Sequence, residues 1–256
     1  MLFVLGDRMD RAAMPVSVDA ELMRVNPIEN FDSCVLRMTL EGGADALFIA
    51  SHSTKETINP VFTYEFEHGC VTYAQDEKTG IVAVFDDGTT KNYGDPFADQ
   101  MNKVRYAIRA ADLGVQAWEL PCTAMTAVPH ARTIAAIADV PMIDVPKSLT
   151  ETVMVGADKT DPLQVVIGLK DALCDCYERG CMLSELDTAQ SADLRAILKP
   201  AMQLPMPMGV FDAAAYAAFF ADRPTLNSER AYQAKMEQLT ADAPKKCRGR
   251  KKKTME

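Results

Sequence analysis

The chain has 256 residues, of which 48% are hydrophobic and 25% charged, and its formal net charge is −9. This composition is that of an ordinary globular protein, and no apolar stretch approaches the roughly 20 residues that a membrane-spanning helix needs. The start of the chain lacks the basic region of a signal peptide, so we expect a cytoplasmic protein. Seven cysteines, an odd number in a chain of this length, do not suggest a disulfide scaffold.

The charge is unevenly distributed. Residues 244–256 hold seven basic residues and one acidic residue, which leaves 20 basic and 35 acidic residues in the rest of the chain. A basic tail on an acidic body can contact nucleic acid or another acidic surface. We favour the simpler interpretation of a disordered end that keeps the chain in solution, and do not expect nucleic acid as a partner.

The first five residues are apolar and are followed by Gly6, a pattern typical of the last turn of a helix with a glycine cap. Apolar residues at the start of a chain need a surface to pack against. We therefore interpret residues 1–6 as the remnant of a longer helix that enters the domain.

Alternating apolar and polar residues predict strands at 16–23, 33–40, 47–52 and 62–67, and shorter strands at 71–73, 81–85 and 89–93. Glu41-Gly42-Gly43 and Asp86-Asp87-Gly88 supply the residues that tight reversals need. Each strand shows one large apolar face. The fold class that follows is α+β, with an open, mainly antiparallel sheet of about six or more strands and helices packed on one face.

Three helices are predicted after Pro96. One runs from Met101 to a stop at Gly114, the second covers 122–138 with Pro129 starting or kinking it, and the third covers 163–179 and ends at Gly180. A strand is predicted at 152–155. We place the compact domain at 1–200, a Pro- and Met-rich connection with a helical extension at 201–243, and the basic tail at 244–256.

Cys174, Cys176 and Cys181 cluster on the third predicted helix and just after it. A structural zinc site would need further ligands at suitable spacing, and the only histidines lie far upstream. Cys174 and Cys181, seven residues apart, could instead be buried positions of an amphipathic helix, and we favour this interpretation.

The common catalytic and phosphate-binding motifs are absent: the sequence contains no G-x-G-x-x-G after a strand, G-x-x-x-x-G-K-[ST], H-E-x-x-H or G-x-S-x-G. His52, at a strand end, could face a ligand or bond to the backbone. His130, near a helix start, could also face a ligand, or it could simply pack against neighbouring residues. Arg24 could bind an anionic or hydroxylated ligand, or pair with Glu21 or Glu29.

A second group of polar residues, Asn26, Glu29, Asn30 and Asp32, precedes a strand. Turn chemistry alone would explain this group, since Asn and Asp side chains bond to their own backbone in turns. From these patterns alone, the chain is an α+β domain of undefined use.

Several motifs occur together in a fixed order: R-x-N-P-I-E-N-F-D, S-H, N-P-x-x-x-Y-x-F-E-H-G-x-V, D-G-T-T-K-N-Y-G-D-P, N-K-V-R-Y-A-I-R-A, C-T-A-M-T-A-V-P-H and G-L-K-D-A-L-C-D-C-Y-E-R-G-C-M-L-S-E-L. In this order they resemble the C-terminal domain of Gfo/Idh/MocA-type oxidoreductases. The resemblance covers about residues 1–190.

The resemblance implies a two-domain enzyme that transfers hydride to or from a sugar, cyclitol or related polyol. In that family an N-terminal Rossmann domain binds NAD(P), and the C-terminal domain supplies part of the substrate pocket and an open sheet used in dimerisation. The family's cofactor loop, catalytic lysine and catalytic aspartate and histidine would all fall before Met1. We therefore expect no catalytic, cofactor-binding or metal-binding residues in this chain, which would be truncated and inactive alone.

Two functional hypotheses follow. In the first, the chain is the substrate-side and oligomerisation half of an NAD(P)-dependent oxidoreductase, with Arg24, Asn26, Asn30, His52 and His130 as substrate contacts. In the second, it is a non-catalytic binding or assembly module that dimerises through its sheet or partners a separate Rossmann subunit. Both hypotheses predict a homo-oligomer formed through the sheet face.

Overall fold

The computed structural model describes residues 1–8, 11–74, 79–98, 100–115, 122–189 and 191–198, and beyond these only 204–205, 214, 216–218, 234 and 237. Backbone contacts divide the chain into two compact units. Unit 1 comprises residues 1–58 and 122–223, and unit 2 comprises residues 59–121 and 224–256. Unit 2 therefore interrupts unit 1 in the sequence, and each unit has its own sheet.

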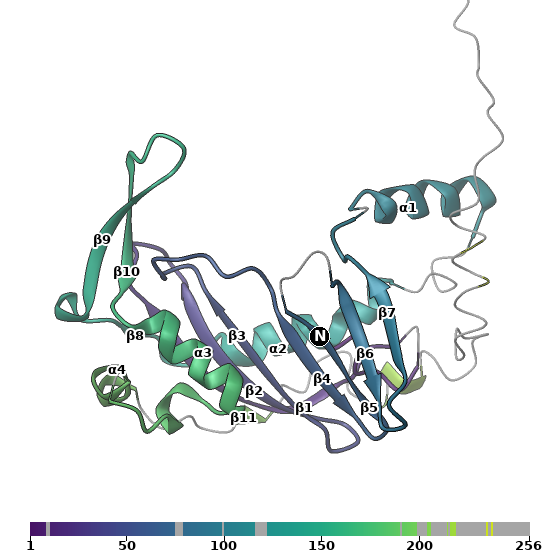
Figure 1. Cartoon of the computed structure of the whole chain (residues 1–256), viewed down its shortest axis with the longest axis horizontal. Coiled ribbons are helices and arrows are strands. Elements are labelled where there is room, and N and C mark those ends of the chain that lie inside the picture. The colour runs from purple at the N-terminus through teal and green to yellow at the C-terminus, as the bar shows by residue number, and fades with distance from the viewer. Residues whose placement is uncertain are drawn as a thin grey trace, which may run out of the picture. The chain divides into compact units, whose positions relative to one another are not determined.

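The sheet of unit 1 is built on three antiparallel strands, β1 (Pro15–Arg24), β2 (Ser33–Leu40) and β3 (Asp45–Ser51) (Figure 1). β11 (Leu204–Pro205) pairs with the other side of β1, and β8 (Ile143–Asp144) runs parallel to the end of β1. Gly42 and Gly43 turn the chain between β2 and β3 with φ angles of 90° and 88°, a region that strains residues with a side chain. The first three predicted strands are confirmed.

One face of this sheet packs against α2 (Val128–Ile137) and the N-terminal segment. The 3₁₀ turn η2 (Met125–Ala127) leads into α2, and Pro129 lies in the first turn of the helix, where its missing N–H costs no hydrogen bond. The N-terminal residues form a turn, with the N–H of Leu5 3.3 Å from the carbonyl oxygen of Met1, but Gly6 does not adopt the positive φ of the predicted glycine cap. The core on this face comprises Leu2, Ala12, Ala13, Val18, Ala20, Leu22, Cys34, Leu36, Met38, Leu40, Ala46 and Ile137.

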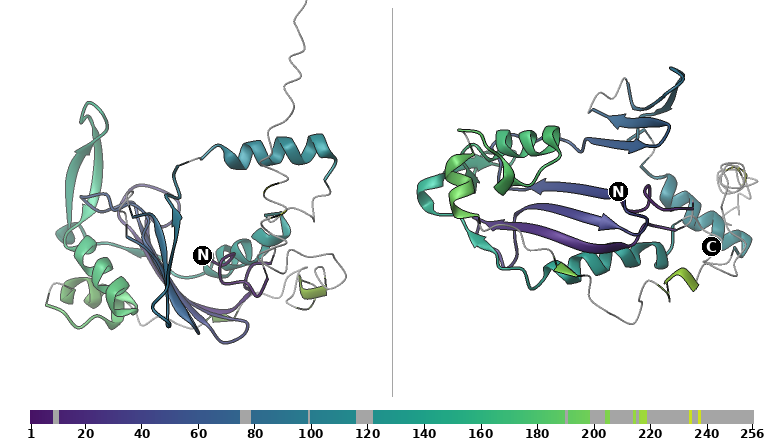
Figure 2. Two further views of the ribbon diagram at one scale, coloured as in Figure 1. Left: turned by 45° about the vertical axis from the view of Figure 1, so that its right-hand side comes forward. Right: turned by 90° about the horizontal axis from the view of Figure 1, so that it is seen from below.

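The opposite face packs against α3 (Leu169–Arg179), the 3₁₀ turn η4 (Leu183–Glu185) and α4 (Ala192–Ile197). Figures 1 and 2 show α2 and α3 on opposite sides of the sheet. The core on this face comprises Met23, Val35, Val145, Val166, Leu169, Ala172, Leu173, Cys176, Met182, Leu183, Leu186, Leu194 and Leu198.

The sequence predicted helices on one face only, and unit 1 has them on both. The reason lies in the strands, which bury consecutive residues rather than alternate ones. In β2, Cys34 and Leu36 face α2, whereas Val35 between them faces α3. The alternation therefore marked one apolar face correctly and missed a second, which only a buried sheet layer requires.

A two-stranded hairpin, β9 (Thr150–Val155) and β10 (Asp161–Val166), follows the 3₁₀ turn η3 (Lys147–Leu149). The strand predicted at 152–155 is confirmed, but the helix predicted from Leu163 is wrong over its first residues. Residues 163–166 pair with β9, and α3 begins only after Gly168, whose φ is 73°. Val165 and Val166 are β-branched and suit a strand, so the left-handed glycine rather than the apolar period sets the start of the helix.

Unit 2 contains an antiparallel meander in the order β4 (Phe62–Phe66), β5 (Gly69–Tyr73), β6 (Ile81–Phe85) and β7 (Thr90–Gly94). The helix α1 (Asn102–Leu113) follows and ends at Gly114 with a φ of 64°, as its glycine stop predicted. The strands predicted at 62–67, 71–73, 81–85 and 89–93 are confirmed.

The α+β class and the open antiparallel sheets are confirmed. The strands are nevertheless divided among a five-stranded, a four-stranded and a two-stranded sheet, where one sheet was expected. Alternation identifies strands, whereas the choice of partner depends on contacts between distant residues. None of the helices in the described ranges is long and apolar enough to cross a membrane.

Residues beyond 198 join unit 1 at two described points. The first is β11, whose backbone pairs with Ser17 and Val18. The second is Tyr216, which is fully buried against Met14. Its hydroxyl accepts the N–H of Ala12 and donates to the carbonyl of Ala12, both at 3.2 Å, while the Arg11 guanidinium lies 5.4 Å from the ring centroid. The segment after residue 200 is thus tied to the N-terminal segment; most of the remaining extension and the basic tail lie outside the described residues.

Candidate functional site

Four of the five candidate residues lie at one end of the sheet of unit 1. Arg24 ends β1, Asn26 and Asn30 lie in the connection to β2, and His52 directly follows β3. The antiparallel register brings the end of β1, the start of β2 and the end of β3 to the same end of the sheet. The backbone N–H of His52 donates to the carbonyl of Asp32 at 2.8 Å, which fixes the two connections side by side.

His130 lies far from this group. It is exposed in the first turn of α2, where Val128 packs against Met14. Met14 directly precedes β1, whose ten residues span about 30 Å, so this turn of α2 lies near the opposite end of the strand from Arg24. The structure does not bring His130 together with the other four candidates.

Arg24 is held by internal contacts. Its guanidinium forms an ion pair with Asp144 of β8 at 2.8 Å and donates to the carbonyls of Ile28 and Glu29 at 3.3 and 3.1 Å. The hydrogen bond to Asp144 raises the pKa of Arg24, and the same bond lowers the pKa of Asp144. The sequence left two roles open for Arg24, ligand binding and pairing with a carboxylate. Arg24 does form an ion pair, but its partner is Asp144 instead of the carboxylate of Glu21 or Glu29.

The side chain of Asn26 has no hydrogen-bond donor left for a ligand. Its amide nitrogen donates to Asp32 Oδ2 at 3.1 Å and to the carbonyl of Gln164 at 3.0 Å, and its amide oxygen accepts the N–H of Gln164 at 2.9 Å. An amide can donate two hydrogen bonds, and both are used. Asn26 therefore links the β1–β2 connection to β10.

Asp32 is the centre of this region, and its carboxylate is buried. Oδ2 accepts the backbone N–H groups of Val25 and Asn26 at 3.0 and 2.9 Å as well as the Asn26 amide. Oδ1 accepts the hydroxyl of Ser53 at 3.2 Å. A buried carboxylate is stable only when it is well hydrogen-bonded. Here the carboxylate links the start of the β1–β2 connection to Ser53, just after β3.

Three serine hydroxyls extend the network around Asp32. Ser33 Oγ lies 2.9 Å from Ser51 Oγ and 2.6 Å from Ser53 Oγ, and the N–H of Ser53 donates to Ser51 Oγ at 3.0 Å. Ser33 and Ser53 are fully buried. We call Asp32, Ser33, Ser51 and Ser53 the Asp32 cluster. It fixes the backbone on both sides of His52.

Of the four candidates at this end of the sheet, Asn30 and His52 have exposed side chains. The Asn30 amide oxygen accepts the N–H of Phe31 at 2.9 Å, and its amide nitrogen has no partner among the described residues. The His52 side chain is exposed, and its ring likewise has none within the part of the chain that the structure describes. At this end of the sheet the arrangement can offer hydrogen bonds to a hydroxylated ligand through these two side chains, on a backbone fixed by the Asp32 cluster.

Glu21 is a second buried carboxylate, on the α3 side of β1. It accepts the backbone N–H groups of Leu183 and Ser184 at 2.8 and 3.1 Å, so it caps η4. Burial raises the pKa of Glu21, although the hydrogen bonds from Ser184 and Leu183 act in the opposite direction. Its contacts attach η4 to the sheet.

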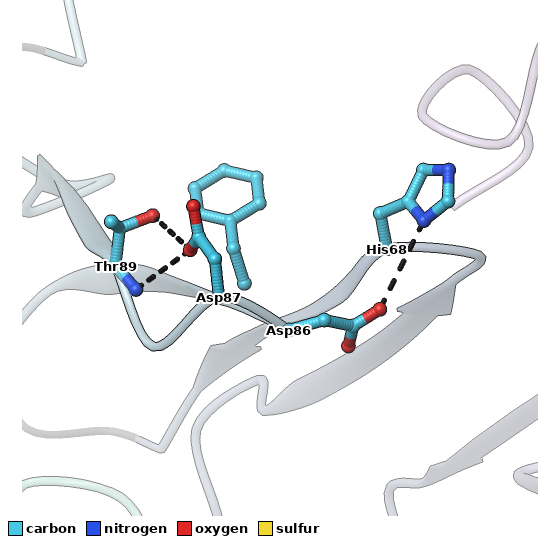
Figure 3. Close-up of a pocket in the computed structure, with 5 residues that line it drawn as sticks. His68, Asp86, Asp87 and Thr89 are labelled. Carbon is cyan, nitrogen blue, oxygen red and sulfur yellow. Dashed lines mark hydrogen bonds and ion pairs between the residues drawn. The ribbon is translucent and has the colours of Figure 1, made fainter.

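Unit 2 has a shallow depression lined by His68, Phe85, Asp86, Asp87 and Thr89, at the ends of the β4–β5 and β6–β7 hairpins (Figure 3). Asp87 Oδ1 accepts the N–H and the hydroxyl of Thr89 at 2.8 and 2.6 Å, as expected for a turn aspartate, and the Thr89 hydroxyl bond lowers the pKa of Asp87. His68 Nδ1 lies 3.9 Å from Asp86 Oδ2, beyond hydrogen-bonding distance. Both of these side chains are largely exposed, and the arrangement is that of two hairpin turns.

The sequence lacks the loop by which a nicotinamide dinucleotide is usually bound. A nicotinamide dinucleotide is normally held where a glycine-rich loop leads from a strand into a helix. The sequence has no such loop, and Gly168, which precedes α3, stands alone. Among the described residues, no group of three or more His, Cys, Asp or Glu side chains could hold a metal ion.

Comparisons with known proteins give no match: no family model, no curated protein and no solved structure is similar to this chain.

Sequence reasoning missed the Asp32 cluster. Asp32 was attributed to turn chemistry, which accounts for its bonds to Val25 and Asn26. Its bond to Ser53 joins residues 21 positions apart, and such a contact leaves no periodic signal. The available signal was a serine on each side of His52 together with an aspartate-serine pair at the start of the neighbouring strand.

Proposed function

We propose that this chain is the substrate-side and oligomerisation half of a Gfo/Idh/MocA-type, NAD(P)-dependent oxidoreductase acting on a sugar, cyclitol or similar polyol. The observation that carries the proposal is the Asp32 cluster with Asn26. These residues come from the R-x-N-P-I-E-N-F-D and S-H motifs and their immediate neighbours, and they form one hydrogen-bonded unit although they lie far apart in sequence.

In this proposal the chain binds and orients the polyol and does not carry out the redox step. Asn30 and His52 would contact substrate hydroxyls, with Arg24 and Asn26 holding the connection from which Asn30 projects. NAD(P), bound by a Rossmann domain outside these 256 residues, would supply the hydride chemistry. The compartment that we propose for this function is the cytoplasm.

The proposal is tested by titrating the purified 256-residue chain with NADH and NADPH, with and without candidate polyols, by calorimetry. We expect no binding of either nucleotide, because the chain has no loop for the pyrophosphate, and weak binding of a polyol that His52→Ala reduces. His130→Ala is the matched control, since His130 lies near the other end of the sheet. Micromolar binding of NADH by the chain alone would contradict the proposal.

The alternative function is a non-catalytic assembly module, and an aromatic face of unit 2 favours it. Residues paired across antiparallel strands share a face, and the register aligns Phe66 with Gly69 and Phe85, and Phe62 with Tyr73. The rings of Phe62 and Tyr64 lie 5.0 Å apart, and those of Phe62 and Tyr73 5.8 Å apart. Phe66 and Phe85 are 48% and 39% exposed, so this face is left partly uncovered within the described chain.

The opposite face of the same sheet is more polar and carries Thr63, Glu65, Cys70, Thr72, Val82 and Val84. An exposed face of linked aromatic rings beside a polar one favours association through the aromatic side. Both functions use this face for a homo-oligomer, and the assembly module differs from the oxidoreductase half in binding no polyol.

The oligomer is tested by Phe66→Glu, with Val84→Glu as the matched control. The two residues are equally exposed, at 48%, but lie on opposite faces of the sheet. We expect a dimer for the unaltered chain and for Val84→Glu, and a monomer for Phe66→Glu, because a buried carboxylate at the interface would lose its hydration. Size-exclusion chromatography with light scattering measures this, and a monomeric unaltered chain would refute the interface.

A further inference from the structure

The C-terminal end of α3 brings two cysteines together. Gly180 follows the helix in the left-handed conformation, with a φ of 64°, and the N–H of Cys181 reaches back to the carbonyl of Cys176 at 3.1 Å. This bond, from the residue after the glycine to the fourth residue before it, is that of a Schellman motif. In that motif the side chains at these two positions contact each other.

The two thiols lie close enough for each to influence the pKa of the other. Cys176 is fully buried, whereas Cys181 is partly exposed. The sequence interpretation placed Cys174 and Cys181 as the buried positions of the helix. The structure instead buries Cys176 and leaves Cys174 and Cys181 at intermediate exposure, because α3 ends before Cys181 and the chain turns back.

We propose that Cys176 and Cys181 are a redox-responsive pair that closes to an intramolecular disulfide by exchange with a small disulfide such as oxidised glutathione. A disulfide requires Cα atoms about 4.4–6.8 Å apart and side chains directed at each other. The turn around Gly180 and the backbone hydrogen bond between the two residues favour both requirements. The product locks the end of α3 to the segment that leads into η4.

The surroundings of the two thiols set the order of the steps. Burial raises the pKa of Cys176 to about 12, with the negative charge of Glu21 adding to the effect. Burial also raises the pKa of Cys181, and Glu185 raises it further, but Arg179 beside it acts in the opposite direction. Cys181 is therefore the more accessible thiol and reacts first, and exchange is slow because little thiolate is present at neutral pH.

The reaction is two successive thiol–disulfide exchanges. Cys181, as thiolate, attacks one sulfur of the small disulfide, forms a mixed disulfide and releases one small thiol. Cys176 then loses its proton and attacks the Cys181 sulfur, which forms the intramolecular bond and releases the second small thiol. Two protein thiols are oxidised, and one small disulfide is reduced to two thiols.

The test uses the full reduced chain, equilibrated in buffers of defined ratio of reduced to oxidised glutathione, quenched with acid and alkylated. Trypsin cleaves after Lys170, Arg179 and Arg195, so Cys176 and Cys181 fall in different peptides that stay together only if the disulfide has formed. Because Cys174 shares a peptide with Cys176, Cys174→Ser is the matched control, and Cys176→Ala and Cys181→Ala are the test variants.

We expect the linked peptide pair in the unaltered chain and in Cys174→Ser, and its loss in both Cys→Ala variants. The equilibrium constant for disulfide formation should be at least about tenfold larger in the folded chain than in urea, since the fold holds the thiols together. A linked pair that survives Cys176→Ala, or equal constants in folded and unfolded chain, would overturn the proposal. Peptide mapping of Cys174→Ser, in which only Cys176 can link the first peptide to Cys181, gives this answer even if Cys176→Ala fails to fold.

Discussion

Asp32→Ala is expected to lower the free energy of unfolding by about 3–5 kcal/mol, because hydrogen bonds to charged groups contribute roughly 1.5–3 kcal/mol each and at least two are lost. The carboxylate is 5% exposed and is the acceptor for the backbone N–H groups of Val25 and Asn26 and for the Ser53 hydroxyl. Alanine leaves these donors without their partner in a space that is largely closed to water. Urea unfolding followed by circular dichroism measures the loss.

Two variants make this result specific to the carboxylate. Asp32→Asn keeps one acceptor oxygen and should lose less stability than Asp32→Ala. Glu29→Ala removes an exposed carboxylate from the same connection, and exposed positions of this kind change stability by within about 0.5 kcal/mol. If Asp32→Ala and Glu29→Ala were equally stable, Asp32 would not be the centre of the connection, and the main support for the proposed function would be lost.

The second large effect is expected at the other end of β1, for Tyr216→Ala. Removing a fully buried aromatic side chain costs about 3–5 kcal/mol, through lost burial and the cavity left behind. Tyr216 also hydrogen-bonds both backbone groups of Ala12 and packs against Met14. Tyr216→Phe keeps most of the packing but removes the hydroxyl, so we expect a loss of about 1–3 kcal/mol from the two backbone groups left unpaired.

Tyr177→Ala is the matched control for Tyr216, since Tyr177 is 40% exposed on α3 and its removal leaves no buried cavity. Thermal and urea unfolding of all three variants would establish the ranking. A chain ending at residue 200 should lose at least as much stability as Tyr216→Ala, because it lacks β11 as well. Equal stability of that shorter chain would show that the extension does not contribute to unit 1.

The elements that the sequence predicted correctly are those whose signal is local. The strands of the meander follow from alternation, and the reversal at Gly42-Gly43 and the helix ends at Gly114 and Gly180 follow from glycines that adopt positive φ. The error at 163–166 has the same origin. A short apolar run fits helix and strand equally, and the decision rests on pairing with β9.

The sequence indicated candidate residues, but it did not indicate the hydrogen-bond partners that hold them in the structure. Arg24, Asn26, Asn30 and His52 lie at one end of the sheet of unit 1, whereas His130 lies near the other end. The partners of Arg24 and Asn26, Asp144 and Gln164, lie 120 and 138 positions away. Contacts over such separations depend on the complete fold, and neither composition nor period contains them.

The double cover of the sheet in unit 1 has a consequence for how its sequence can drift over evolutionary time. In β2, Cys34 and Leu36 belong to the core on the α2 side, and Val35 belongs to the core on the α3 side. Consecutive residues of this strand are therefore all constrained by packing. In β6 the residues alternate between the aromatic and the polar face, and Val84, on the polar face, is 48% exposed, so we expect it to tolerate substitution. In saturation mutagenesis, we expect substitutions to be poorly tolerated at consecutive positions of β2, and to be tolerated at every second position of β6.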